Sequence, residues 1–187
     1  MAKIGEISTS CKNVKIKPGN VDAISTYLKK EISGTNINIG MAAMEAGTAL
    51  ALGLRKDFVS GGKTLIGAYL LKYKEKRPMV LDKLKAFLEA ILVCANFEDM
   101  AEGIIPCLTN IAPAVQNGTV KFVEALTLVT YSDVLEKIAP ELMPVMVKLI
   151  DAKDGGVRDS TLHCLGILKG RLGDKYSKYL KDGAANK

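Results

Sequence analysis

The 187-residue sequence has no tryptophan and one histidine, and aromatic residues make up only 5% of it. A hydrophobic core must therefore be built mainly from Leu, Ile, Val, Ala and Met, which is typical of stacked helices. Since hydrophobic residues account for 48% of the chain, there is enough apolar surface for one domain with a core, and intrinsic disorder is not expected.

Cysteine is also scarce and scattered. The four cysteines, Cys11, Cys94, Cys107 and Cys164, form no Cys-x-x-Cys pair, and the single histidine is His163. Because zinc sites need about four clustered ligands, we expect no metal ion and no cofactor. Buried thiols in a reducing compartment are the simpler interpretation.

Long apolar runs are missing as well. No stretch of about 18 apolar residues is free of charge, so no membrane-spanning helix is predicted. The first residues, Met1–Gly5, are not followed by the apolar run of a signal peptide. We therefore expect a cytoplasmic protein that has no membrane among its partners.

No segment meets the requirements of a common active site. Ser60–Thr64 resembles the end of a phosphate-binding loop, but the first glycine of that motif would fall at Asp57, and the preceding segment has a helical pattern. His163 stands beside Cys164 with no acid or serine at a local triad spacing, so we expect a packed or half-buried histidine. Asn117–Thr119 matches a glycosylation sequon, which we interpret as a turn. Because none of these segments has the complete pattern of an active site, we expect a binding protein and not an enzyme.

The apolar residues recur at the spacing of amphipathic helices, and no segment has the pattern of a β-strand. The predicted helices pair over residues 20–56, 58–95, 97–130 and 132–172, followed by a short basic helix near 174–181, with an N-terminal arm or helix remnant at 1–19 and a flexible tail at 182–187. Turns are predicted at Asn36, Pro78, Gly118 and Gly156, which are 42, 40 and 38 residues apart. This period and two helices per unit predict an all-α fold, an α-solenoid of HEAT repeats.

These turns define the register of the repeats. They align Val80, Val120 and Val157 at one position and Leu88, Leu128 and Leu165 at another. Asn20 and Asn36 are the predicted N-caps of the first two helices. In the last hairpin, Asp151–Ser160, Gly155 and Gly156 are expected to end the first helix, because glycine adopts left-handed backbone angles without steric cost.

Stacked hairpins place their turns along one edge, and several of these turns are basic. The candidate binding residues are Asn36, Lys74, Lys76, Arg77, Lys121, Lys153 and Arg158. Lysines at helix ends favour the helix dipole, which alone accounts for Lys74 and Lys153. Arg77, Lys121 and Arg158 are expected near helix starts, where a cation is mildly unfavourable, so we interpret them as contacts to an acidic partner. The excess of 26 Lys and Arg over 20 Asp and Glu, a net charge of +6, agrees with this interpretation.

Four segments and their order carry a family resemblance. They are Gly53–Phe58, Leu71–Pro78, Asn96–Glu98 and Val157–Ser160, with Pro18 and Gly19 ahead of the first complete repeat. Through these collinear motifs, residues 18 to 181 resemble the TOG domains of the microtubule-polymerase family, which CLASP proteins contain in a more divergent form. The resemblance implies a paddle-like domain of HEAT repeats whose turns form one tubulin-binding edge.

The resemblance also implies roles for single residues. Asn36 matches the turn of the family's second repeat, Lys76 and Arg77 the basic turn of the third, Lys121 the basic residue of the fourth, and Lys153 with Arg158 the fifth. The family's first repeat places a tryptophan in its turn, whereas this chain has no tryptophan and shows four hairpins. The implied function is binding of αβ-tubulin and microtubule ends, in microtubule growth or plus-end regulation. The implied setting is the cytoplasmic microtubule cytoskeleton, with the spindle or centrosome, and a monomeric module of a longer protein.

Two other interpretations of the residues stay open. A HEAT-repeat scaffold would bind another protein through its helical faces, and its binding would depend on an exposed apolar patch. A nucleic-acid-binding solenoid is the third interpretation, but the turns lack the aromatic residues on which bases stack, so nucleic acid is not the expected partner.

Overall fold

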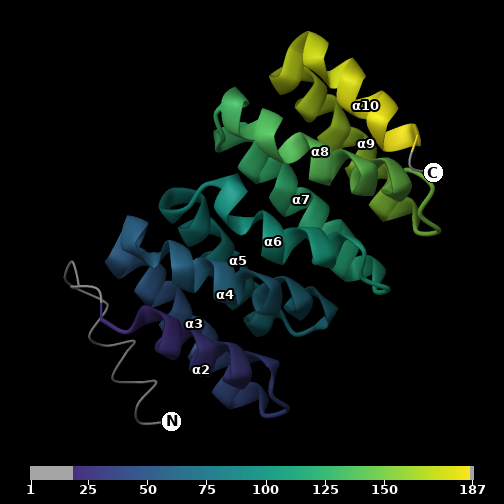
Figure 1. Ribbon diagram of the computed structural model, residues 1–187. Helices are drawn as coiled ribbons and strands as arrows, with labels where there is room; N and C mark the ends of the chain where they lie inside the picture. The colour runs from purple at the N-terminus through teal and green to yellow at the C-terminus, as the bar shows by residue number, and fades with distance from the viewer. Residues whose placement is uncertain (1–18, 186–187) are drawn as a thin grey trace. The chain divides into compact units, whose positions relative to one another are not determined.

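The computed structural model describes residues 19–185, and side chains through residue 181, so the predicted arm lies almost wholly outside the described part. The helices are, in chain order, α2 (Val21–Ser33), α3 (Ile37–Leu54), η1 (Arg55–Phe58), α4 (Val59–Leu70), η2 (Leu71–Lys74), α5 (Pro78–Cys94), α6 (Phe97–Leu108), α7 (Pro113–Val129), α8 (Ser132–Leu149), α9 (Gly155–Leu172), η3 (Gly173–Lys175) and α10 (Tyr176–Ala185). Figure 1 shows them as successive pairs, and the described residues contain no strand. The prediction of an all-α fold of paired helices is confirmed.

The chain divides into two compact units, one that ends at Ala95 and one that begins at Asn96. The first unit contains α2 to α5, and the second contains α6 to α10. The predicted repeat domain, residues 20–181, extends over both units. The helical backbone of α10 continues to Ala185, which is further than the predicted end of the last helix.

In the first unit, α2 packs on α4 and α3 packs on α5, so each helix lies against its counterpart in the next pair. Three of the few aromatic residues meet in this core. The ring of Tyr69 stacks on Phe87 with centroids 3.6 Å apart, and Phe58 meets Phe87 edge to face at 6.4 Å. All three side chains are fully buried. The Tyr69 hydroxyl donates to the carbonyl oxygen of Met44 on α3, so its polar atom has a partner inside the core.

Helix starts in this unit follow the predicted capping residues. Oδ1 of Asn20 accepts a hydrogen bond from the N–H of Ala23 at 3.1 Å, and Asn36 caps α3 in the same way. Pro78 is the first residue of α5, where its missing N–H leaves no helical hydrogen bond unmade. Local sequence is therefore enough to begin these helices.

The segment Ser60–Thr64 lies inside α4, and it follows helical residues instead of a strand. It therefore forms no phosphate-binding loop. Gly61 serves packing, because a Cβ atom there would lie 2.7 Å from both the Phe58 ring and the Ser25 hydroxyl oxygen. The glycine lets α4 approach α2 closely.

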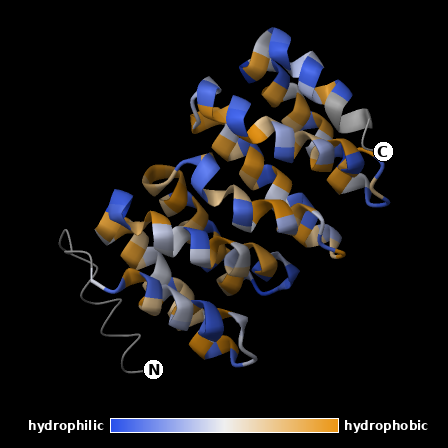
Figure 2. Cartoon of the chain, in the orientation of Figure 1, coloured by the Kyte–Doolittle hydropathy of each residue, from blue (hydrophilic) through white to orange (hydrophobic). Residues whose placement is uncertain are grey.

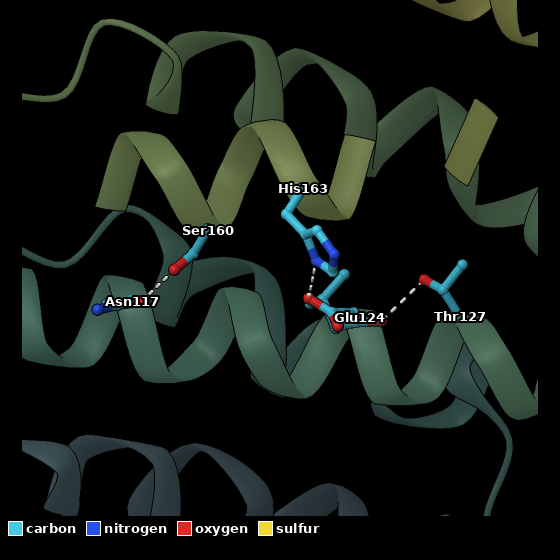
Figure 3. Close-up of polar contacts among 6 residues, drawn as sticks. Asn117, Glu124, Thr127, Ser160 and His163 are labelled. Carbon is cyan, nitrogen blue, oxygen red and sulfur yellow. Dashed lines mark hydrogen bonds and ion pairs between the residues drawn. The ribbon is translucent and has the colours of Figure 1, made fainter. Parts of the chain in front are cut away.

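In the second unit, α7 packs on α9, and α8 packs on both α6 and α10. Figure 3 shows two polar contacts between α7 and α9. The Ser160 hydroxyl donates to Asn117 at 2.6 Å, and Nδ1 of His163 lies 3.0 Å from Glu124. The prediction of a packed or half-buried histidine is wrong, because the His163 side chain is 68% exposed. Its acidic neighbour is 39 residues away in the chain, so only the stacking of repeats brings the two together.

The third turn lies between α6 and α7, at residues 109–112, and the prediction of a turn at Asn117–Thr119 is wrong. Pro113 is the first residue of α7, and Oδ1 of Asn110 accepts from the N–H of Ala112 at 3.0 Å, so these residues form the turn. The glycine and threonine of the predicted turn are buried inside α7, which packs against α9. Helix packing outweighs the local turn preference of the Asn-Gly pair.

The register of the third repeat therefore differs from the predicted one by five residues. Val115 takes the place of Val120 at the equivalent position. It is the third residue of its helix, as are Val80 and Val157, and these three side chains are fully buried. Leu128 is 56% exposed, so it is not equivalent to the two buried leucines that were aligned with it.

The fourth turn consists of residues 150–154, and Gly155 and Gly156 are the first two residues of α9. Neither glycine has a positive φ, so the prediction that they end the preceding helix in a left-handed conformation is wrong. The N-cap of α9 is Asp154, whose Oδ1 accepts from the N–H of Val157 at 3.0 Å. The aspartate, and not glycine flexibility, starts the helix here.

One helical stretch of the described part, Ile37–Lys74, is long and apolar enough to meet a length-and-composition test for a membrane span. Half of its most apolar window is buried within the chain, and its first helix, α3, packs on both α2 and α5. Glu45 is the only charged residue of α3. These contacts are those of an apolar core helix with neighbours on most sides.

Candidate functional site

Each unit has two turns that connect the helices of a pair, and these turns lie at one end of their unit. In the first unit they are Gly34–Asn36 and Glu75–Arg77. Because α2 packs on α4 and α3 on α5, the two turns lie on the same side (Figure 1). In the second unit, residues 109–112 and 150–154 are related in the same way by the packing of α6 on α8 and of α7 on α9.

The turn between α4 and α5 carries the strongest positive charge among these turns. It places Lys74, Lys76 and Arg77 beside one carboxylate, that of Glu75, and Figure 2 shows it as a hydrophilic segment. The three cationic residues are exposed. The Arg77 guanidinium lies 4.0 Å from the Glu75 carboxylate, an exposed pair that contributes little to stability. In the described part of the chain, no hydrogen bond or ion pair engages the ammonium groups of Lys74 and Lys76, so both can contact a partner.

Asn36 has a structural role at the first turn. Its Oδ1 accepts from the N–H groups of Asn38 at 3.1 Å and Ile39 at 3.3 Å, so this oxygen is occupied by the cap. The residue is exposed, and its side-chain N–H groups have no partner among the described residues. Asn36 therefore offers a partner two donors and no charge.

Lys153 lies in the fourth turn and Arg158 in the first turn of α9, and the fold already uses the arginine. Nη1 of Arg158 donates to the carbonyl oxygens of Ala152 at 2.8 Å and Lys153 at 3.0 Å, so the guanidinium closes the turn. Two carboxylates, those of Asp151 and Asp154, balance the two cations. This turn is therefore close to neutral, in contrast to the turn between α4 and α5.

The structure places Lys121 away from the turns. It is the ninth residue of α7 and exposed on the surface of the helix, because the turn expected just before it is absent. The third turn instead presents Ile111, which is 96% exposed. Sequence reasoning missed this residue, although Asn110 and Pro113 on either side of it are turn signals.

Of the three cations expected near helix starts, Arg77 is the one whose position still indicates an acidic partner. Arg77 is the N-cap of α5, where a cation opposes the helix dipole, as the sequence suggested. Arg158 is held by backbone carbonyls, which accounts for a cation near the start of α9. Lys121 lies in the middle of its helix, where the dipole has little effect.

In the described part of the chain, the thiols of Cys94 and Cys164 are buried, and the Ser160 hydroxyl is hydrogen-bonded within the fold. Burial, with a smaller effect from nearby Glu124, raises the pKa of the Cys164 thiol from 9.0 to about 12. Burial also raises the pKa of the Cys94 thiol, and this outweighs the opposing effect of Arg55. The Ser160 hydroxyl donates to an amide and not to the neighbouring histidine. Among the described residues, no group of three His, Cys, Asp or Glu side chains is placed to hold a metal ion.

Comparison with known proteins finds relatives that are similar in sequence over most of this chain. Over 165 residues, 86% of this chain, the sequence is 34% identical to the protein mini spindles of Drosophila melanogaster. The chain spans 8% of the length of that protein. No protein-family model matches the chain.

Solved structures share the fold. One, described as the structural basis of microtubule plus end tracking by XMAP215, CLIP-170 and EB1, matches with a TM-score of 0.80 and 29% identity over 99% of this chain and 79% of the other. A second concerns tubulin recruitment and assembly by microtubule polymerases with Tumor Overexpressed Gene (TOG) domain arrays. It matches with a TM-score of 0.78 over 98% of this chain and 41% of the other, and its 20% identity shows the fold alone.

Proposed function

Because the chain belongs to the TOG-domain family of the microtubule polymerases, we propose that it binds αβ-tubulin through the turns within its helix pairs. In this function it contributes to microtubule growth or plus-end regulation. The helix pairs at 20–56, 58–95, 97–130 and 132–172 act as HEAT repeats of a TOG-like domain over residues 20–181. The chain acts as a binding module and not as an enzyme, one part of a longer protein of the microtubule cytoskeleton.

The turn between α4 and α5 is the observation that carries the proposal. Lys74 and Lys76 have no partner within the described residues, and Arg77 is 65% exposed with one weak ion pair. Holding these cations together costs electrostatic energy that an acidic surface would recover, and charge complementarity also speeds association. The acidic surface of αβ-tubulin that the family binds is a partner of this kind.

The remaining candidate residues have different roles in this proposal. Asn36 and Lys153 contribute exposed donors at turns. Arg158 orders the fourth turn and has guanidinium N–H groups left over for a partner. Lys121 takes part only if tubulin also reaches the surface of α7.

A charge reversal at the basic turn tests the proposal. The full chain and the variant Lys76→Glu/Arg77→Glu would be mixed with purified αβ-tubulin, and complex formation would be followed by size exclusion and fluorescence anisotropy. We expect the variant to bind about tenfold more weakly, a loss of about 1.4 kcal/mol, because two attractive contacts become repulsive.

The single variant Lys76→Glu is measured in the same assay, and Lys56→Glu is its matched control. Lys56 is exposed in η1, at the other end of α3 from the turns, so its reversal changes net charge equally but should leave binding within about twofold. Lys121→Glu asks in the same assay whether the face of α7 contributes. Equal binding by wild type and the Lys76→Glu/Arg77→Glu variant would contradict the proposed site.

A scaffold that docks a protein on its helical faces is the second candidate function. Three exposed apolar residues favour it. They are Leu128 and Val129 at the end of α7 and Tyr131 in the link to α8, and Tyr131 is 79% exposed. This function predicts partner binding that is lost on Tyr131→Ser and is insensitive to reversal of Lys76 and Arg77.

A further inference from the structure

Ile111 is the most exposed of the large hydrophobic side chains in the described part, at 96%, and Tyr131 follows at 79%. Single exposed apolar residues are common on protein surfaces and carry no meaning alone. The position of Ile111 sets it apart, because it lies in the third turn, at the same end of the second unit as the fourth turn with Lys153.

The backbone around Ile111 is held by hydrogen bonds on both sides. The Thr109 hydroxyl donates to the carbonyl oxygen of Pro106 at 3.0 Å, and the N–H of Ala112 donates to Oδ1 of Asn110 at 3.0 Å. Isoleucine is also stiff at χ1 because it is branched at Cβ. Binding through this residue would therefore cost little conformational entropy, as is typical of a preorganised contact.

Charge in the second unit offers little attraction at this end. The third turn, residues 109–112, contains no charged residue, and the two carboxylates of the fourth turn balance Lys153 and the nearby Arg158 of α9. The basic residues of the proposed site are concentrated in the turn between α4 and α5 of the first unit. A contact made by the second unit must therefore depend on something other than net charge.

We propose that Ile111 is a tubulin-contacting residue that binds an apolar part of the tubulin surface. This inference rests on the proposed function, and it adds an apolar contact, independent of salt, to a site otherwise described by its cations. Burying a fully exposed isoleucine side chain on binding is expected to strengthen the complex about tenfold.

The test compares the variants Ile111→Ser, Ile111→Leu and Val129→Ser in the full chain, by fluorescence anisotropy with purified αβ-tubulin. Val129 is the matched control, because it is 57% exposed and lies at the opposite end of α7. Measurements at about 50 mM and about 200 mM KCl separate charge from apolar contact, since screening acts on the former. Thermal melting checks that the exposed substitutions leave the fold intact.

We expect Ile111→Ser to weaken binding about tenfold at both salt concentrations, with Ile111→Leu and Val129→Ser within about twofold of wild type. If wild type binds tubulin and Ile111→Ser binds equally well, the role of Ile111 is refuted and the proposed function stands. Equal losses for Ile111→Ser and Val129→Ser would also refute it, in favour of docking on the helical faces. If wild type does not bind tubulin at all, the proposed function itself fails.

Discussion

The guanidinium groups of Arg77 and Arg158 have different surroundings although both lie near helix starts. Arg158 donates to two carbonyl oxygens of the adjacent turn, whereas Arg77 faces solvent beside a single carboxylate at 4.0 Å. A residue that already stabilises its turn is a weaker indicator of a partner than one without such contacts. Residue-scale evidence therefore favours the turn between α4 and α5 as the main charged contact.

The buried thiol of Cys164 predicts how stability depends on alkaline pH. The folded chain keeps this proton up to about pH 12, while an unfolded thiol loses it near pH 9.0. Above pH 9 the folded state therefore binds more protons than the unfolded state, so the free energy of unfolding falls as pH rises, by at most about 1.4 kcal/mol per pH unit for this group. Below that range the thiol is protonated in both states and contributes no slope.

Urea unfolding of wild type and Cys164→Ala between about pH 8 and about pH 11 checks this prediction. The variant should lose less stability over the range, although not zero, because burial also raises the pKa values of Tyr69 and Cys94. Identical slopes for the two proteins would contradict the assignment to Cys164.

At the scale of helices, two glycines in helix interiors have opposite surroundings. A Cβ atom on Gly47 in α3 would overlap the hydroxyl oxygen of Tyr69, which is buried and stacked on Phe87 and cannot move away. A Cβ atom on Gly166 in α9 would meet no atom within 4 Å. Gly47 therefore permits close packing of α3 against Tyr69, whereas Gly166 is not needed for helix packing within its unit.

Alanine substitutions should therefore have opposite effects on stability. Gly47→Ala is expected to lower the free energy of unfolding by about 1–3 kcal/mol through overpacking. Gly166→Ala should raise it by about 0.5–1 kcal/mol, because alanine is the better helix former. Both values would be measured by urea denaturation.

A double variant isolates the cause of the first effect. Tyr69→Phe removes the hydroxyl that a Cβ atom at Gly47 would overlap, so Gly47→Ala should cost less in the Tyr69→Phe background than in wild type. Equal cost in both backgrounds would mean that the hydroxyl is not the obstacle.

For the molecule as a whole, the net charge of +6 predicts binding that depends on ionic strength. Affinity for αβ-tubulin should fall by about tenfold between about 50 mM and about 300 mM KCl, because exposed charge pairs are screened. The Lys76→Glu/Arg77→Glu variant should show a flatter dependence, since it lacks the main cations of the site.

An RNA competitor in excess should leave the tubulin complex intact, and displacement by RNA would favour a nucleic-acid-binding function.

Sequence alone determined the local features of this protein. Apolar periodicity predicted an all-α fold of paired helices, and Asn20, Asn36 and Pro78 begin their helices as expected. These features depend on residues within a few positions of each other, where spacing, capping and the missing N–H of proline act directly. The exposed basic turn at Lys74–Arg77 was visible for the same reason.

Tertiary structure decided the features that depend on residues about 40 positions apart. Asn117 and Gly118 form a helix instead of a turn because α7 packs on α9, and His163 meets Glu124 across the same contact. As a result, the third turn lies at residues 109–112 and not beside Lys121, and it exposes Ile111. The physical reason is that burying a helix face between neighbours outweighs the small local preferences of a turn dipeptide, and no local pattern encodes which neighbour will be there.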